Sequence, residues 1–467
     1  MEITQEFQSR TKRLIEELTV RSSSDLQCTS GAWEELSVHF LIAPNWSADY
    51  AGQLMLLSSV NLIGRFCNNL SLPESLKKVR SKAAFAYGSG VDLLESCIDI
   101  ATSINPTLKI RVVSSMPENA IALGIGAKAD ITITSDGWFS CLNCSQLSIP
   151  CRDNQNPFGP LIASCLGAAE IFRKLLSRLG AKGSIANRAL SNIRFSALDY
   201  SCNDPLAVNP AFPESIDVGN ILCCGSGAVT NGVAAALRFI NGLTGSVTFL
   251  DDQNLELSNI GRYYLAKLTD VGQRKTQHLV RVFDNHSLSA HPLTMPVEAV
   301  TPLDLTRYKT VICALDNRDN NRGRIHLQNM LPERIIHAAT QGLAIALANI
   351  DFLDGICLGC LFSPRQAEIS TIADPSCGGV TIHVENRDEI AASVSFVSTM
   401  SGISAASELI KLSVPELNSF ALRNYLSLSL MSPDLADVRF RAKDPNCVCL
   451  CSERFRQEAY KAKQHEE

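Results

Sequence analysis

Short apolar runs alternate with longer helical stretches along most of this chain. In the second half, the apolar runs predict strands at residues 218–224, 245–251, 308–316, 334–340 and 347–353. Strands that alternate with helices predict an α/β fold whose sheet is mostly parallel. This half closes with a helix rich in Ser, Ala and Gly, predicted at residues 395–412.

The first half follows a similar plan in weaker form. Its predicted strands lie at residues 38–44, 83–88, 108–115 and 129–135, and its helices at residues 52–70, 91–104 and 156–180. The last of these helices is again apolar and rich in small residues. We interpret the halves as a diverged internal duplication, against the alternative that any two α/β domains share this much pattern.

This organisation predicts three regions. Residues 1–215 form an α/β domain, residues 216–430 form a second α/β domain, and residues 431–467 form a C-terminal segment with clustered cysteines and a charged tail. At 467 residues the chain is long enough for two such domains, each with its own core.

Composition narrows the class of protein. The net charge of −5 provides no basic field for nucleic acid, and the chain has neither a signal-peptide core nor an apolar run long enough to span a membrane. We therefore expect a cytoplasmic protein without nucleic-acid or membrane partners. In that compartment the 17 cysteines are expected to stay reduced rather than to form a disulfide framework.

A nucleotide site is predicted where the first strand of the second half ends. Gly225 and Gly227 follow this strand and precede a helix, and Asp251 ends the next strand. Glycines let backbone N–H groups approach phosphate at a helix N-terminus, and an acid at the second strand suits a ribose diol. The first half has Ala43 to Trp46 at the matching turn, which indicates a copy without catalytic function.

Further polar residues follow in a fixed order. Asn259 and Arg262 come after Asp251, then Lys275, then the pair Asp316 and Asn317 at a strand end. An arginine and a lysine that converge on phosphate would stabilise a phosphoryl centre, with Asp316 as a Mg²⁺ ligand. Hydride transfer by a nicotinamide-dependent dehydrogenase, the main rival, needs neither cation. A P-loop motif is absent from the sequence.

These motifs resemble the ThiF/MoeB family, the adenylating domain of ubiquitin-activating enzymes. The resemblance covers residues 220–412 and rests on LDDQNLELSNIGR, VGQRK and CALDN in their fixed order. Two departures stand out: the second acidic position of the family pattern moves to Asp252, and the glycine loop GSGAVTNG holds fewer glycines. The resemblance implies two Rossmann-like adenylation-type domains arranged as a pseudo-dimer, of which the first is inactive.

The resemblance also implies an activity. In such enzymes the C-terminal carboxylate of a ubiquitin-like or sulfur-carrier protein attacks the α-phosphate of ATP. Arg262, Lys275 and Mg²⁺ on Asp316 would reduce the repulsion between the two anions, while Asn259 would orient a phosphate or ribose oxygen. Standalone relatives borrow an arginine from a second subunit. Here Arg10 or Arg13 of the N-terminal helix would supply it within one chain.

Clustered cysteines resemble the family's zinc knuckle. Cys357 and Cys360 form one C-x-x-C pair, and Cys447 together with Cys449 or Cys451 would complete four thiolate ligands for a structural Zn²⁺. Cys141 and Cys144 form another C-x-x-C, which we interpret as a metal-free pair because a convincing second pair is lacking.

Cys377 has a different setting. It lies between Pro375 and two glycines, ahead of the helix that ends the second half. In the family, a cysteine in this loop takes the acyl group from AMP, so Cys377 is the expected thioester nucleophile.

The expected partners are a ubiquitin-like protein with a C-terminal glycine and a conjugating enzyme. The apolar helix NPFGPLIASCLGAAEIFR resembles ThiF-like proteins of bacterial ubiquitin-like conjugation operons of the BilD type. Two alternatives stay open at this point: a sulfur-carrier adenylyltransferase of the MoeB/ThiF kind, and a scaffold without catalytic activity. The sequence leaves the choice between monomer and homo-oligomer open.

Overall fold

The fold was analysed in a computed structural model of the chain. It describes residues 33–82, 91–144, 155–179, 192–315, 318–330, 332–341, 343–351, 356–361, 381–384, 387–391, 394–430, 435 and 437–438. The expected strand at residues 83–88, the N-terminal helix and residues 439–467 lie outside this described part.

The first sheet has seven strands in the order β3-β2-β1-β4-β5-β6-β7. The five strands from β3 to β5 are parallel, and β6 and β7 are added in antiparallel orientation. The strands are β1 (Ser37–Ile42), β2 (Asn69–Pro73), β3 (Lys109–Val113), β4 (Ile121–Ile125), β5 (Ile131–Asp136), β6 (Phe139–Leu142) and β7 (Ile193–Ser196).

The second sheet has eight strands in the order β10-β9-β8-β11-β12-β13-β16-β17. Again the first five are parallel and the remaining three are antiparallel. The strands are β8 (Ile216–Cys224), β9 (Leu243–Leu250), β10 (Ser289–Leu293), β11 (Thr310–Cys313), β12 (Arg334–Gln341), β13 (Ala344–Asp351), β16 (Tyr425–Ser429) and β17 (Asp437–Val438). A separate hairpin pairs β14 (Thr381–Val384) with β15 (Arg387–Ala391).

The two sheets share one plan. In each, the first strand along the chain lies in the middle of the sheet, and the next two strands extend the sheet to one edge. The chain then crosses to the other side of the first strand, where it adds two more parallel strands and finally the antiparallel ones. The expected pair of parallel-rich α/β sheets is therefore confirmed, and the matching strand order is what a duplication would produce. Strands β2, β4, β6, β7, β10, β14, β15, β16 and β17 were not predicted. The helix predicted at residues 52–70 ends at Gly64, and β2 begins within its predicted range.

The helices differ greatly in length. Four carry most of the packing: α4 (Tyr50–Gly64), α6 (Phe158–Arg178), α8 (Ala228–Arg238) and α15 (Ser395–Ser413). The others that matter for the site are α5 (Leu93–Ile104), α9 (Leu257–Ile260), α10 (Lys275–Arg281), α12 (Arg318–Asn329) and α13 (Leu358–Leu361). Three short ones are α3 (Pro44–Ser47), α11 (Pro302–Leu305) and the 3-10 turn η2 (Leu268–Asp270).

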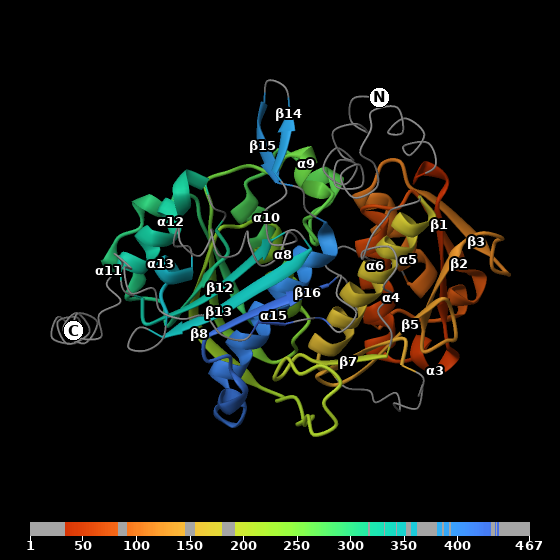
Figure 1. Ribbon diagram of the computed structural model, residues 1–467, viewed down its shortest axis with the longest axis horizontal. Helices are drawn as coiled ribbons and strands as arrows, with labels where there is room; N and C mark the ends of the chain where they lie inside the picture. Colours follow the sequence, from red (N-terminus) through yellow and green to blue (C-terminus); the bar gives the residue numbers. More distant parts are fainter. Residues whose placement is uncertain are drawn as a thin grey trace.

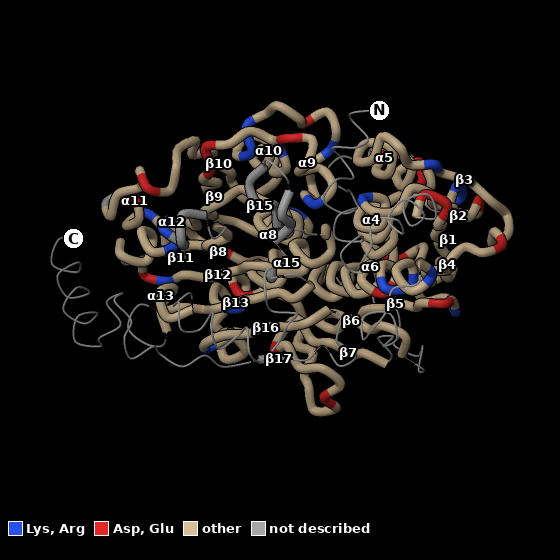
Figure 2. Tube along the Cα trace, turned by 45° about the horizontal axis from the view of Figure 1, so that its top comes forward, with Lys and Arg blue, Asp and Glu red and all other residues tan. Residues whose placement is uncertain are grey.

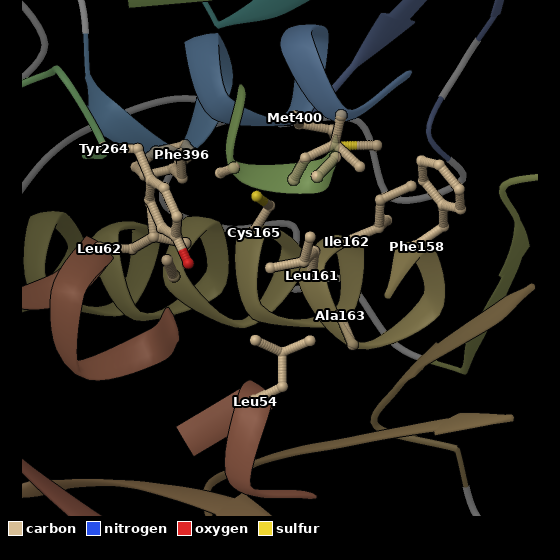
Figure 3. Packing of buried hydrophobic residues seen from close by; sticks show 14 of the residues in the cluster. Leu54, Leu62, Phe158, Leu161, Ile162, Ala163, Cys165, Tyr264, Phe396 and Met400 are labelled. Carbon is tan, nitrogen blue, oxygen red and sulfur yellow. The ribbon is translucent and has the colours of Figure 1, made fainter. Parts of the chain in front are cut away.

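The long helices lie between the two sheets. Helix α6 packs on β5 and on α4, whereas α15 packs on β12 and on α8, and α6 contacts α15 where the halves meet (Figure 1). Figure 3 shows the resulting core, in which side chains of α4, α6 and α15 meet. One continuous cluster of buried apolar residues includes both Phe158 of α6 and Phe396 of α15. A small residue of α15 permits a close approach to α8: a Cβ on Gly402 would stand 2.1 Å from the carbonyl oxygen of Val229 in α8.

Buried ion pairs repeat across the interface. Glu170 pairs with Arg173 on α6, and Glu408 pairs with Lys411 on α15, at the same spacing in the two helices. Arg173 also donates to the carbonyl oxygen of Leu430 in the second half, at 3.3 Å. Lys411 correspondingly donates to that of Leu198 in the first half, at 2.8 Å. Each basic side chain thus satisfies a backbone acceptor of the opposite half, just after β16 for Arg173 and just after β7 for Lys411.

Among the described residues, no helix is both long and apolar enough to cross a membrane.

Candidate functional site

The candidate site lies at the carboxyl ends of β8, β9 and β11. Gly225 follows β8 with φ of +87°, and a Cβ at that position would stand 3.0 Å from the carbonyl oxygen of Ala314 after β11. Glycine is therefore required by both its backbone angle and its close neighbour. In a parallel sheet whose strand order reverses here, this is the crevice where ligands bind.

Two side chains of α8 hold the glycine loop in place. The hydroxyl of Thr230 donates to the carbonyl oxygen of Gly225, and the amide of Asn231 donates to that of Gly227 at 2.9 Å. Thr230 stands where the sequence pattern would place a further glycine. These two hydrogen bonds hold the loop carbonyls of Gly225 and Gly227 in place, and they give the loop a defined shape.

Asp251, at the end of β9, is bound to the loop. One carboxylate oxygen accepts from the backbone N–H of Ser226 and the other from that of Gln253, both at 2.9 Å. The hydroxyl oxygen of Ser226 is buried and has no hydrogen-bond partner within the described part of the chain. Asp251 therefore stands beside the glycine loop, as expected for a residue that reaches a nucleotide.

Arg262 and Lys275 converge on one aromatic ring. The ring centroid of Tyr263 lies 5.5 Å from the guanidinium carbon of Arg262 and 5.8 Å from the ammonium nitrogen of Lys275. The hydroxyl of Tyr263 lies 3.6 Å from the place a Cβ on Gly227 would take. Two cations thus flank a buried tyrosine that borders the glycine loop, and the Nε of Arg262 lacks a partner among the described residues.

The sequence analysis missed Gln253. Its side-chain oxygen accepts a hydrogen bond from the ammonium group of Lys275 at 2.6 Å, and its carbonyl accepts from the backbone N–H of Lys275 at 3.0 Å. The second acidic position of the family pattern falls on Asp252 in the sequence, but Asp252 is exposed and its carbonyl oxygen accepts a hydrogen bond from Arg274. A neutral amide rather than a carboxylate therefore faces Lys275, which leaves more of the positive charge available to an anion.

Asn259 is buried at the short helix α9. Its side-chain oxygen accepts from the backbone N–H of Glu256 at 3.1 Å and so completes a capping box. This contact fixes the turn that precedes Arg262. The expected contact of Asn259 with a phosphate or ribose oxygen stays a prediction.

Charge is concentrated around this turn. Figure 2 shows basic residues on the chain around α9 and α10, above the central helices. Behind Lys275 on α10, His278 pairs with Asp270 at 3.3 Å, and both side chains are buried. Burial alone raises the pKa of Asp270, but hydrogen bonds from His278 and from the backbone of Lys267 outweigh it and hold this pKa below its usual value.

Several expected site residues lie outside the described residues. These are Arg10, Arg13, Asp316, Asn317, Cys377, Cys447, Cys449 and Cys451. Leu315, two residues after β11, is described, and its carbonyl oxygen accepts a hydrogen bond from Arg324 at 3.0 Å. The roles given to these residues stay predictions.

Cys357 and Cys360 are both described and buried. Their sulfur atoms lie 3.8 Å apart, and the backbone N–H of Cys360 donates to the sulfur of Cys357 at 3.4 Å. No group of three or more metal-ligating side chains occurs among the residues that the structure describes. The zinc knuckle is therefore not shown.

In the first half, a tryptophan side chain fills the position that corresponds to the glycine loop of the second half. Trp46 of α3 is only 3% exposed, and its indole ring lies against Gly126, where a Cβ would stand 1.9 Å from the ring. Gly126 follows β4, which corresponds to β11 of the second sheet. An aromatic side chain thus occupies the crevice that the glycine loop borders in the second half.

Two curated proteins resemble part of the chain. An uncharacterised protein, y4jF, from Sinorhizobium fredii is 29% identical over 275 residues, which are 57% of this chain and 50% of that protein. An adenylyltransferase and sulfurtransferase, uba4, from Emericella nidulans is 23% identical over 245 residues, which are 50% of this chain and 48% of that protein. The chain thus spans about half the length of the curated relatives it matches.

Solved structures give weaker likenesses. Escherichia coli MccB with succinimide has a TM-score of 0.37 at 15% identity and covers 50% of this chain and 66% of that chain. The complex of the same protein with ATP has a TM-score of 0.37 at 14% identity, with the same coverage.

A family model provides the firmest comparison. The model of the ThiF family matches residues 207–449, more than half of the chain and all of the strands that border the candidate site. The chain therefore belongs to the ThiF family.

Proposed function

We propose that this protein activates the C-terminal carboxylate of a ubiquitin-like protein by adenylation and then passes the acyl group to Cys377. The observation that carries the proposal is the convergence of Arg262 and Lys275 on Tyr263, beside the glycine loop. Two cations near a glycine loop suit a polyphosphate, whereas hydride transfer itself needs neither of them.

The first step joins two anions. A carboxylate oxygen of the carrier forms a bond to the α-phosphorus of ATP while the bond between the α- and β-phosphates breaks, and pyrophosphate leaves with the electron pair. Arg262 and Lys275 would offset the charge that accumulates on the phosphate oxygens. Gln253 would hold the ammonium group of Lys275 in position. Mg²⁺, which Asp316 would hold, neutralises phosphate charge when it is bound.

The second step moves the acyl group. The Cys377 thiolate would attack the acyl carbon of the adenylate, a carbon–sulfur bond would form, and AMP would leave with the electrons of the broken bond. A conjugating enzyme would then receive the thioester.

Isotope exchange between pyrophosphate and ATP tests the first step. The purified chain should catalyse this exchange only when a ubiquitin-like protein with a free C-terminal glycine is present. Arg262→Ala should lower the exchange rate by about 10²–10³-fold, the typical loss when one transition-state donor is removed. The matched control is Arg281→Ala, at the far end of α10, which should retain the rate. Affinity for NAD together with no affinity for ATP would refute the proposal.

The thioester step has its own test. After incubation with ATP and the carrier, a thiol-labile adduct should appear on the wild-type chain and be missing from Cys377→Ala, while pyrophosphate exchange continues. An adduct that persists in Cys377→Ala would overturn the assignment of the nucleophile and leave the adenylation step in place.

The spacing of Cys357 and Cys360 suits a structural zinc ion. In a tetrahedral site with Zn–S bonds of about 2.3 Å, two sulfurs are about 3.8 Å apart, which matches the observed separation. We propose that Cys447 with Cys449 or Cys451 provides the remaining ligands. Metal analysis should find one zinc per chain, lost in Cys357→Ser and retained in Cys97→Ser, a buried cysteine of the first half.

A sulfur-carrier adenylyltransferase is the second candidate. The similarity to the adenylyltransferase and sulfurtransferase uba4 favours it. This candidate predicts a thiocarboxylate at the C-terminus of the carrier instead of a thioester to Cys377, and mass spectrometry of the carrier after reaction with a sulfur donor would distinguish the two.

A further inference from the structure

Arg65 is a buried arginine of the first half that reaches into the second. It lies just after α4, its side chain is 1% exposed, and its Nε donates to the side-chain oxygen of Asn61 at 2.9 Å. Its terminal nitrogens donate to the carbonyl oxygens of three residues in the second half, Ile260, Tyr264 and Ala266. The distances to Tyr264 and Ala266 are 2.7 and 3.0 Å.

These three carbonyls enclose Arg262 in the sequence. We call residues 259–266 the arginine segment. It begins in the last residues of α9 and continues as an irregular stretch, which carries Arg262 and Tyr263, to Lys267. The turn hydrogen bonds within this segment use the carbonyls of Asn259 and Tyr263. Buried carbonyls that such turns do not use need partners elsewhere. A single guanidinium group satisfies several of them at once because its five N–H donors form a rigid planar fork.

Other contacts hold the same segment. The hydroxyl of Tyr264 donates to the hydroxyl of Ser58 on α4 at 2.7 Å, and Asn231 accepts from the backbone N–H of Leu265 at 3.2 Å. Asn231 also donates to Gly227, so its amide joins the arginine segment to the glycine loop. Figure 3 shows Tyr264 entering the core near Leu62 of α4.

We propose that Arg65 is a positioning residue for Arg262, through which the first half acts on the phosphate site of the second. Arg65 does not itself contact the nucleotide; it fixes the backbone from which Arg262 and Tyr263 project. The inference rests on the proposed function, because it requires that Arg262 contacts a phosphate. It also gives the first half a role in the reaction, although Trp46 fills its own crevice.

A comparison of ATP with adenosine tests this role. Both probes share the base and the ribose, but only ATP carries the phosphates that Arg262 would contact. Isothermal titration of the full chain should show that Arg65→Met weakens ATP binding about 10- to 100-fold, the size of one charge-assisted hydrogen bond, while adenosine binding stays unchanged. Arg65→Lys, which keeps the charge and a donor, should restore part of the loss.

Arg173→Met is the matched control. Arg173 is also a buried arginine of the first half that donates to a carbonyl of the second, but that carbonyl belongs to Leu430, far along the chain from the arginine segment. If Arg65 served general stability alone, the two variants would affect ATP and adenosine alike. In the double variant Arg65→Met with Arg262→Ala, ATP should bind as weakly as in Arg262→Ala, because both changes remove the same contact.

The outcomes separate the two proposals. If the wild-type chain bound ATP no better than adenosine, the proposed function would fail. If wild-type ATP binding depended on Arg262 but Arg65→Met left the ratio of ATP to adenosine affinity unchanged, the role of Arg65 alone would be overturned. If Arg65→Met does not fold, Tyr264→Phe provides the test, because it removes one contact between α4 and the arginine segment. This variant should lower the ratio of ATP to adenosine affinity by a smaller factor. An unchanged ratio would contradict the proposal.

Discussion

At the same point of two sheets with the same strand order, one half has a tryptophan and the other a glycine turn. Trp46 packs against Gly126 in the first half, whereas Gly225 and its neighbours leave backbone N–H groups at the N-terminus of α8 in the second. The surrounding layers are alike, so the difference lies in the turn and not in the fold. The first half can therefore lack an open ligand crevice and still provide the second half with a packing surface and with Arg65.

The largest expected effect is a loss of stability when the tryptophan that fills the crevice of the first half is removed. Trp46→Ala should lower the free energy of unfolding by about 3–5 kcal/mol, because a buried aromatic side chain leaves a cavity. Denaturant titration measures the loss. If the first half is a silent copy, the variant gains no second ATP site, and a stoichiometry of two nucleotides per chain would contradict that interpretation.

The repeated ion pairs offer a second test of the comparison. Lys411→Met leaves the buried carboxylate of Glu408 without its cation and should cost about 3 kcal/mol. The hydroxyl of Tyr200 and the N–H of Leu422 still donate to Glu408, which limits the cost. Arg173→Met on α6 is the mirror-image change. Equal losses in denaturant titration would show that the two pairs stabilise the interface alike, and a loss in only one would contradict it.

A third change acts on the second half alone. Lys275→Ala should slow pyrophosphate exchange by about 100-fold, because it removes a cation that stabilises charge developing on the phosphate. The neighbouring Arg274 is exposed and serves as the control, since Arg274→Ala leaves the hydrogen bond between Lys275 and Gln253 intact. Similar rates in the two variants would remove Lys275 from the mechanism.

The smallest expected effect is a difference in thiol reactivity between the two C-x-x-C pairs. Cys144 of the first half accepts a hydrogen bond from the thiol of Cys141, which lowers the pKa of Cys144 to about 7 and raises that of Cys141. Iodoacetamide reacts with the thiolate, so labelling of Cys144 should rise as the pH increases through about 7. Peptide mapping should find Cys357 and Cys360 protected by burial, and equal labelling of both pairs would contradict this difference.

Much of this architecture could be predicted from local pattern. The predicted strand at residues 218–224 and the helix at residues 395–412 coincide largely with β8 and α15, and the strand predicted at residues 308–316 contains the shorter β11. Their apolar periodicity spans enough residues to be distinct. The five-residue strands β4 and β10 were missed, although β3 of equal length was predicted. Strand β10 is largely exposed and contains Pro292, so it carries little apolar pattern.

The site was predicted less completely. Asp251, Arg262 and Lys275 could be selected from their order along the chain, because parallel strands bring their carboxyl ends to one edge of a sheet. Gln253 was passed over, since a single amide in a loop gives no signal until Lys275 is seen beside it. Asn231 and Arg65 were equally inconspicuous, one inside an Ala-rich helix and the other after an apolar one.

By itself, the sequence determined the two α/β halves, their order and the charged residues of the second, because these follow from periodicity and spacing over short stretches. The tertiary structure alone decided that Trp46 closes the first crevice and that Arg65 holds the arginine segment nearly two hundred residues away in the sequence. Such contacts depend on how two separately patterned sheets pack through α6 and α15. No local pattern encodes that packing, because it is a property of the assembled core.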